Sequence, residues 1–192
     1  MSSKILNKRG KLFILSGPSG AGKGTLRERA LKNVEDLVYS ISCTTRPPRA
    51  GETNGVEYRF ISLNDFEDRI KLNKFLEYAN VHGCYYGTLR DDVERELDAG
   101  RDVLLEIDVQ GAEQVKNILH DAILIFIMPP SREILEARLR ARGTESEDVL
   151  QVRLKNAELE MSRAGNYNHV IINNDLELAA KELKEIILSY RN

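Results

Sequence analysis

A glycine-rich segment near the start of the chain has the residue types and spacing that bind phosphate. The segment consists of Gly17, Pro18, Ser19, Gly20, Ala21, Gly22, Lys23, Gly24 and Thr25. In such a loop the glycines let successive backbone N–H groups turn toward an anion, and the helix that follows adds its positive end. The lysine then reaches the outer phosphates of a nucleotide. We therefore expect these residues to bind nucleotide phosphates, with Lys23 in contact with the reacting group.

The position after the lysine departs from the usual magnesium pattern. That pattern has Ser or Thr directly after the lysine, whereas here Gly24 follows Lys23 and Thr25 comes next. Magnesium keeps several waters in sites of this kind, so Thr25 or Glu106 could contact the ion indirectly. We expect Mg²⁺ to accompany the nucleotide and assign no direct metal ligand.

A second candidate phosphate site is a loop that holds two arginines. Arg46 and Arg49 flank Pro47 and Pro48, and Tyr58 follows. Guanidinium groups bind phosphate through paired hydrogen bonds, and the prolines stiffen the loop that carries them. Since the first loop accounts for one nucleotide, this segment is the candidate site for a phosphate acceptor.

The elements that position these segments alternate between short apolar runs and amphipathic stretches. Buried strands are predicted at residues 12–15, 38–41, 103–107, 122–128 and 170–172. Helices are predicted at residues 26–37, 91–99, 112–119, 132–142, 146–161 and 176–190. This alternation predicts an α/β fold with a parallel sheet covered by helices on both faces.

Two segments interrupt the alternation. Residues 43–90 contain turn residues, alternating runs and one helix, and we expect a small insertion with its own strands. Residues 131–161 contain a helix pair around Gly143 that could move as a lid. The whole chain is then a single domain, residues 1–192. Its core comprises residues 1–42, 91–130 and 162–192.

Composition and charge argue against several classes of protein. With 42% hydrophobic residues and a net charge of −2, the 192-residue chain resembles neither a disordered protein nor a general nucleic-acid binder. Its two cysteines lack metal-ligand spacing, which favours a reducing cytoplasm. The first apolar run is too short for a signal peptide or a membrane span. We expect a cytoplasmic protein that binds small molecules, and neither nucleic acid nor membrane.

An ordered series of motifs resembles those of guanylate kinases over nearly the whole chain. The motifs are the phosphate loop, residues 42–58, Phe75-Leu76-Glu77, Tyr85-Tyr86-Gly87-Thr88, Ile107-Asp108-Val109-Gln110-Gly111, Arg142-Gly143-Thr144 and Asn173-Asn174-Asp175. The resemblance implies a five-stranded parallel sheet of the P-loop NTPase type. It also implies a GMP-binding insertion at residues 43–90 and a helical lid at residues 131–161.

The same resemblance implies substrates and site residues. ATP would bind residues 17–25 with Mg²⁺ as cofactor, and the acceptor would be GMP, with dGMP as a further candidate. The implied GMP contacts are Ser42, Arg46, Arg49, Tyr58, Glu77, Tyr86, Thr88 and Asp108. The implied catalytic cations are Lys23, Arg46, Arg138, Arg142 and Arg153. The expected reaction moves the terminal phosphoryl group of ATP onto GMP and yields ADP and GDP.

The chemistry of guanine agrees with these assignments. Its pairing edge has N–H donors at N1 and N2 beside the O6 acceptor, so a carboxylate and a hydroxyl complement it. Adenine has the opposite order, and a buried site left with unpaired polar groups rejects the wrong base. The acceptor phosphate is already largely dianionic near pH 7, so the reaction needs no general base.

Two alternatives remain open at this point. Guanylate-kinase-like domains also serve as non-catalytic protein-interaction modules, and a related kinase could take another monophosphate or a phosphorylated sugar. Interaction modules typically have a degraded phosphate loop or acceptor site, whereas this chain has the loop and both acceptor arginines. The sequence assigns no oligomeric state.

Overall fold

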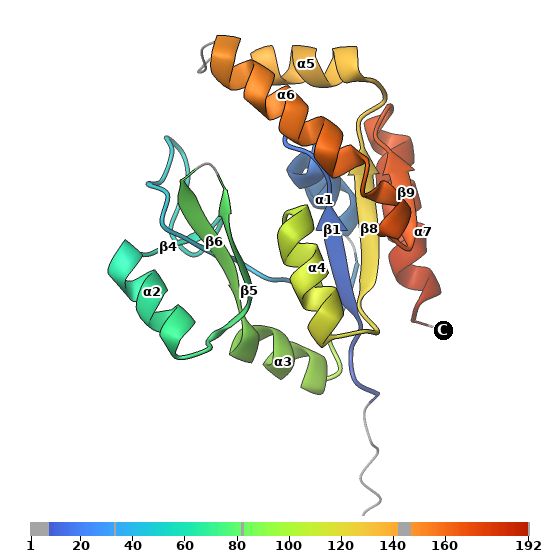
Figure 1. Cartoon of the computed structure of the whole chain (residues 1–192). Coiled ribbons are helices and arrows are strands. Elements are labelled where there is room, and N and C mark those ends of the chain that lie inside the picture. The colour runs from blue at the N-terminus through green and yellow to red at the C-terminus, as the bar shows by residue number, and fades with distance from the viewer. Residues whose placement is uncertain (1–7, 33, 82, 142–146, 192) are drawn as a thin grey trace, which may run out of the picture. The chain divides into compact units, whose positions relative to one another are not determined.

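The structure, a computed structural model, describes residues 8–32, 34–81, 83–141 and 147–191 (Figure 1). Contacts within the chain divide it into two units. Unit 1 comprises Met1–Leu12, Asp36–Leu105 and Gln110–Ala122. Unit 2 comprises Phe13–Glu35, Glu106–Val109 and Ile123–Asn192. The predicted division into core, insertion and lid cuts the chain at other residues and stays a prediction.

Five parallel strands form the larger sheet, in the order β2-β7-β1-β8-β9. Their bounds are β1 Leu12–Ser16, β2 Leu37–Tyr39, β7 Asp102–Glu106, β8 Ile123–Met128 and β9 His169–Ile172. Strands β1 and β8 are continuous apolar runs buried along nearly their whole length, as expected for parallel strands with both faces covered. The five-stranded parallel sheet is confirmed, and each predicted strand lies within two residues of the observed one.

Helices follow most strands, as the alternation predicts. Their bounds are α1 Lys23–Leu31, α2 Leu63–Lys71, α3 Arg90–Asp98, α4 Val109–Ile118, α5 Arg132–Arg140, α6 Glu147–Met161 and α7 Leu176–Ser189. The helix predicted over residues 26–37 is wrong at its end, because α1 stops at Leu31. Asp36 has a φ of 54°, and Leu37 pairs with Asp102 of β7 as a strand residue. Helical spacing of apolar residues continues to Leu37, but the pairing with β7 decides its conformation.

Both faces of the β1–β8 pair in unit 2 are covered. Phe13 of β1 contacts Tyr190, the residue after α7, with ring centroids 6.0 Å apart. Phe126 of β8 pairs with Ser16 of β1, which is three positions after Phe13. Because side chains alternate along a strand, Phe13 and Phe126 lie on opposite faces of the sheet. On the face of Phe126, Met161 at the end of α6 packs against the cluster that contains Phe126. Helices on both faces are therefore observed, as predicted.

A second, four-stranded sheet lies within residues 43–90. Its order is β4-β3-β6-β5, with β3 Cys43–Thr44, β4 Arg59–Phe60, β5 Phe75–Val81 and β6 Cys84–Leu89. One face packs against α2 through Phe66, whose ring stacks on those of Phe75 and Tyr85 at 4.3 and 5.3 Å between centroids. This leaves the other face of the small sheet for polar residues.

Helices α5 and α6 pack against each other in unit 2. Their shared cluster contains Leu135, Leu139, Leu150, Leu154 and Ala157. At the surface, the two Nη atoms of Arg140 donate to both carboxylate oxygens of Glu147, at 2.6 and 2.8 Å. The predicted helix pair is therefore present, while Gly143 lies outside the described residues.

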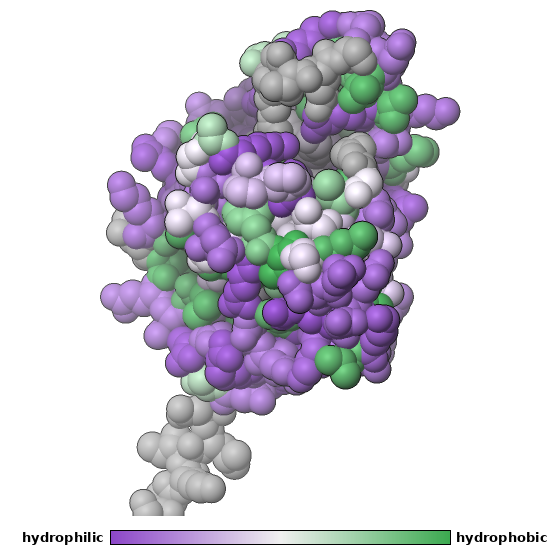
Figure 2. Space-filling model, turned by 90° about the vertical axis from the view of Figure 1, so that its left-hand side faces the viewer, coloured by the Kyte–Doolittle hydropathy of each residue, from purple (hydrophilic) through white to green (hydrophobic). Residues whose placement is uncertain are grey.

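The surface is mostly hydrophilic on the face shown in Figure 2, with apolar side chains in small groups. Charged residues make up 30% of the sequence, which agrees with this view. Among the described residues, every helix is too short or too polar to pass through a lipid bilayer.

Candidate active site

The glycine-rich loop links β1 to α1 in unit 2, and its conformation requires glycine, as two positions illustrate. Gly17 and Gly22 have φ angles of 142° and 88°, which disfavour other residues. A Cβ on Gly17 would lie 2.3 Å from the carbonyl oxygen of Ile127, and one on Gly22 would lie 2.6 Å from Nδ2 of Asn173. Gly22 precedes α1 and has no side chain to cap it, so the first N–H groups of the helix point toward the loop.

Lys23 lies inside this loop. Its Nζ donates to the carbonyl oxygens of Gly17 and Pro18 at 2.5 and 3.2 Å. The ammonium group is thus placed among the backbone amides that the sequence assigns to phosphate binding. This arrangement brings positive charge from the side chain and from the start of α1 to one point.

Two predicted lid arginines reach the loop from the helix pair. Arg138 of α5 donates from Nη1 to the carbonyl oxygen of Ala21 at 3.4 Å and from Nη2 to that of Asn173 at 3.1 Å. Arg153 of α6 hydrogen-bonds to Oγ of Ser19. The third predicted arginine, Arg142, lies outside the described residues. The loop, α5 and α6 therefore bring Lys23, Arg138 and Arg153 together in unit 2.

Asp108, the predicted base contact between β7 and α4, also belongs to unit 2. It lies near Glu160 of α6, a half-buried residue that the sequence analysis did not single out. Burial raises the pKa of the Glu160 carboxyl; the positive charge of Lys23 opposes this shift, and the negative charge of Asp108 adds to it.

Four predicted acceptor-site residues share one face of the small sheet in unit 1. Residues paired across strands face the same side, and β6 pairs Thr88 with Glu77 and Tyr86 with Thr44. Since Tyr86 and Thr88 are two positions apart, both face away from α2. Ser42, two positions before Thr44, follows the same alternation.

A β-bulge lets Glu77 face this side. The register of β5 against β6 shifts between Phe75 and Glu77, so the rings of Phe75 and Tyr78 both contact Phe66 on the α2 side. Glu77 then points the opposite way, where its Oε1 accepts a hydrogen bond from Oγ1 of Thr88 at 2.6 Å. Both side chains are buried. This buried carboxylate and hydroxyl are the two groups that the sequence predicts to contact guanine.

Arg46 completes this face together with two tyrosines. Its Cζ lies 5.5 Å from the ring centroid of Tyr58, whose ring lies 5.7 Å from that of Tyr86. The hydrogen bond from Nη2 of Arg46 to Oε1 of Glu52, at 2.8 Å, raises the pKa of Arg46 and lowers that of Glu52. Arg49 is exposed, and its backbone N–H donates to Oε2 of Glu52 at 2.7 Å. The structure thus gathers a guanidinium and two phenols beside the buried Glu77–Thr88 pair.

Comparison with known proteins agrees with the glycine-rich loop and with the polar face of the small sheet. The family model described as guanylate kinase matches residues 9–190. The chain belongs to the guanylate kinase family. A guanylate kinase from Fusobacterium nucleatum is 53% identical over 182 residues, which cover 93% of this chain and 96% of the relative. One from Neisseria gonorrhoeae is 50% identical over 184 residues, 96% of this chain and 90% of the relative.

A solved structure shows the same fold. The crystal structure of guanylate kinase from Anaplasma phagocytophilum superposes with a TM-score of 0.81 at 34% identity. The match covers 97% of this chain and 88% of that one. Membership of the guanylate kinase family thus agrees with the five-stranded sheet as well as with the sequence.

Two residues without a predicted role support the site in this family member. Glu52 holds the side chain of Arg46 and the backbone of Arg49, and its place three residues after Arg49 was the available signal. Asn173 is buried and donates from Nδ2 to the carbonyl oxygen of Ala21 at 2.7 Å. Asn173 lies in a motif that carried the family resemblance, but nothing local linked it to the loop.

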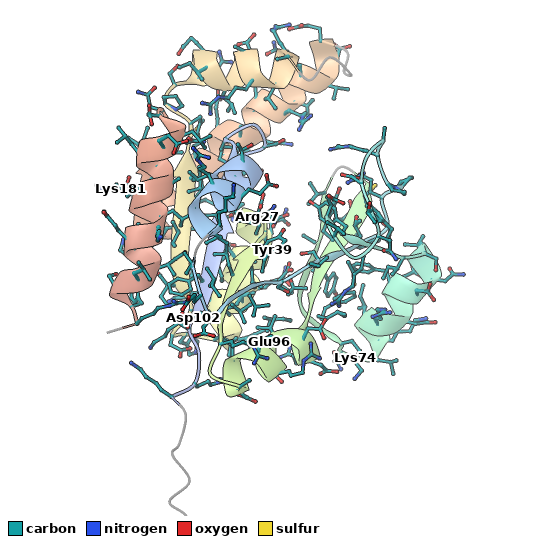
Figure 3. The ribbon with its side chains drawn as sticks, turned by 180° about the vertical axis from the view of Figure 1, so that it is seen from behind. Arg27, Tyr39, Lys74, Glu96, Asp102 and Lys181 are labelled. Carbon is teal, nitrogen blue, oxygen red and sulfur yellow. The ribbon has the colours of Figure 1, made fainter. Side chains whose placement is uncertain are left out.

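The residues beside the loop are compatible with a magnesium ion that arrives with a nucleotide. A Cβ on Gly24 would lie 3.9 and 4.0 Å from the carboxylate oxygens of Glu106, so this acid lies next to the loop, and Thr25 is exposed. Nε of Arg27, labelled on α1 in Figure 3, is 3.7 Å from Oε2 of Glu106. Within the described ranges no three His, Cys, Asp or Glu residues form a metal cluster. One carboxylate suits Mg²⁺, which takes its other ligands from phosphates and water.

Proposed function

We propose that this chain transfers the γ-phosphoryl group of ATP to the phosphate of GMP and releases ADP and GDP, as part of purine nucleotide metabolism. Its membership of the guanylate kinase family supports this reaction. The observation that carries the acceptor assignment is the buried Glu77–Thr88 pair on the same sheet face as Arg46. One face then offers groups for a guanine base and for a phosphate.

Guanine selection rests on Glu77 and Thr88. The Glu77 carboxylate accepts from the N1 and N2 donors of guanine, and the hydroxyl groups of Thr88 and Ser42 lie on the same side of the sheet. Adenine would place an acceptor opposite the buried carboxylate and leave it unpaired. Such a mismatch costs about 1–3 kcal/mol for each buried group, and more for a charged one. Asp108 is a further base contact in this proposal.

The GMP phosphate binds Arg46, Arg49, Tyr58 and Tyr86. Glu52 holds the guanidinium group of Arg46 and the backbone N–H of Arg49, so the Arg46 side chain loses less freedom when phosphate binds. The phenol groups add neutral hydrogen-bond donors. Because the phosphate is already a dianion near pH 7, its oxygen attacks without a general base.

Transfer requires the chain to offset mutual repulsion. ATP and GMP together carry on the order of six negative charges. Lys23 and the start of α1 stabilise the β- and γ-phosphates, while Arg138, Arg142 and Arg153 from the lid stabilise charge on the group in transit. The lid, residues 131–161, and the insertion, residues 43–90, are in this proposal the parts that close over the substrates and exclude water.

Magnesium is the proposed cofactor. When bound, it neutralises charge on the β- and γ-phosphates. Glu106 and Thr25 would hold it through its water shell. We also place the reaction in the cytoplasm, a proposal supported by two cysteines that are both free thiols.

A coupled assay of ADP release with a panel of acceptors tests the proposed function. GMP and dGMP should support turnover with ATP and Mg²⁺, whereas AMP, UMP, CMP and a sugar phosphate should be poorer by about a hundredfold or more. Turnover with another acceptor in place of GMP would reassign the substrate. Binding of ATP without turnover on any acceptor would favour a non-catalytic interaction module.

A further inference from the structure

Strand β5 is an edge strand of the small sheet, and one side chain occupies part of that edge. Nε2 of Gln114 donates to the carbonyl oxygen of Tyr78 at 2.9 Å, and the backbone N–H of Tyr78 donates to Oε1 of Gln114 at 3.2 Å. Gln114 lies on α4 and, like Tyr78, in unit 1. Its amide thus pairs with the backbone of Tyr78 as a neighbouring strand would, at one position of this edge.

The residue held in this way directly follows Glu77. The β-bulge before Glu77 adds a residue to β5, which leaves the ladder disrupted just where the carboxylate must be aimed. Pairing with β6 fixes one side of the strand, since Glu77 lies opposite Thr88 and Tyr78 opposite Gly87. Gln114 fixes the edge of β5 that faces away from β6, through its two hydrogen bonds to Tyr78. A strand held on both sides next to a bulge has less freedom to twist than one held on a single side.

We propose that Gln114 is a positioning residue for guanine recognition, which holds the backbone of β5 so that the Glu77 carboxylate meets N1 and N2 of the base. This inference rests on the proposed function. Gln114 acts through the backbone of Tyr78, 36 positions away in the sequence, and needs no contact with the substrate. Its effect is therefore confined to selection of the base, with no direct effect on ATP.

Gln114→Met removes both hydrogen bonds and keeps side-chain length and helix propensity. The readout is the ratio of kcat/KM for GMP to that for IMP, because IMP lacks only the exocyclic amino group at position 2. We expect this ratio to fall about tenfold, since small misplacements of a recognition group cost this much or more. The KM for ATP should stay within about twofold of the wild-type value.

Asn117→Met is the matched control, because Asn117 is an exposed residue on the same helix. It should leave the GMP to IMP ratio unchanged. A purely structural role for Gln114 would lower the melting temperature and reduce activity on both bases equally. That result, or a wild-type ratio in a folded Gln114→Met protein, would overturn the proposal.

A measurement on the wild-type protein keeps the test decisive should Gln114→Met not fold. The amide of Tyr78 should exchange with solvent more slowly than that of Asn80, which points to the same edge two positions on. Equal rates would count against Gln114. Glu77→Gln separates the two proposals: if the wild type phosphorylates GMP and Glu77→Gln loses base selection while Gln114→Met keeps it, only the role of Gln114 fails. If the wild type does not phosphorylate GMP, the proposed function itself fails.

Discussion

At the residue scale, the site cations are held by partners from their own chain. Lys23 bonds to two loop carbonyl oxygens, and Arg46 bonds to Glu52. Buried charge is costly unless it is paired, so these contacts hold each cation at its position without removing its charge. The result is a set of oriented donors, which is the form of electrostatic stabilisation that a phosphoryl transfer needs.

Replacement of Lys23 by Ala should lower kcat by about a hundredfold to a thousandfold, since one donor to the transferring group is lost. The fold should persist, because Lys23 is not among the buried residues of the hydrophobic core. Steady-state kinetics beside a thermal melt measure both effects. Lys32→Ala, an exposed lysine directly after α1, should behave as the wild type. Near-normal turnover of a folded Lys23→Ala protein would refute the assignment.

Replacement of Glu77 by Gln should raise the KM for GMP by about tenfold to a hundredfold, because a charged acceptor for two guanine donors becomes a neutral amide. Gln keeps the shape of Glu and can still accept from Thr88, so the small sheet should remain folded. The KM for ATP should change by less than about twofold. Equal losses for both substrates would mean that Glu77 does not recognise guanine.

At the element scale, side-chain alternation explains how the acceptor site is assembled. The pairing of strands β3, β4, β5 and β6 places Glu77, Tyr86 and Thr88 on one face of the small sheet and the aromatic cluster around Phe66 on the other. The bulge in β5 reconciles the two demands, since without it Phe75 and Tyr78 would face opposite sides. The apolar face stabilises the small sheet, and the polar face is available for the substrate.

The α5–α6 pair carries an ion pair with a definite pH dependence. Hydrogen bonds from Arg140, and then from Gln151, lower the pKa of Glu147 from 4.5 to about 2. A lowered pKa stabilises the folded form fully above pH 4.5, and this contribution is lost as the pH falls toward 2. Glu147→Gln should therefore melt below the wild type at pH 6, by a small margin because the pair is exposed.

Thermal melts between pH 3 and pH 7 check this expectation. The difference in melting temperature between the wild type and Glu147→Gln should shrink progressively below pH 4.5. High salt should reduce it as well. Glu182→Gln, a change on the exposed side of α7, is the control and should show no such trend. A margin independent of pH would mean that the Arg140–Glu147 pair does not stabilise the helix pair.

At the scale of the whole molecule, the two proposed substrates draw mainly on different units, and Asp108 of unit 2 is the one proposed GMP contact outside unit 1. The phosphate loop, Arg138 and Arg153 belong to unit 2, whereas Arg46, Glu77 and Thr88 belong to unit 1. Each nucleotide should then stabilise mainly its own unit when it binds alone.

Hydrogen exchange with single ligands tests this division. GMP alone should slow amide exchange in residues 43–89, and a non-hydrolysable ATP analogue with Mg²⁺ should slow it in residues 17–25. When the ligand concentration is a hundredfold above Kd, binding stabilises the closed form by about 2.7 kcal/mol, which corresponds to about a hundredfold slower local opening. AMP serves as the control for GMP and should leave residues 43–89 unchanged. Protection of the glycine-rich loop by GMP would contradict the assignment.

Local patterns in the sequence determined much of this protein. The glycine-rich loop and the buried strands follow from neighbouring residues, because backbone freedom and side-chain alternation act over a few positions. Family motifs indicated Arg46, Glu77 and Thr88 as acceptor-site residues, and the structure brings these to one sheet face. Their individual roles stay predictions, as does that of Arg142.

Tertiary structure alone decided the contacts between distant segments. Pairing with β7, not the helical spacing of apolar residues, ends α1 before Leu37. The hydrogen bond from Arg138 to Ala21 spans 117 positions, and that from Tyr78 to Gln114 spans 36. No local sequence pattern predicts such pairs, because each residue fits the pattern of its own helix or strand whether or not its distant partner is present. Only the folded chain selects which polar groups meet, since burial makes an unpaired group costly.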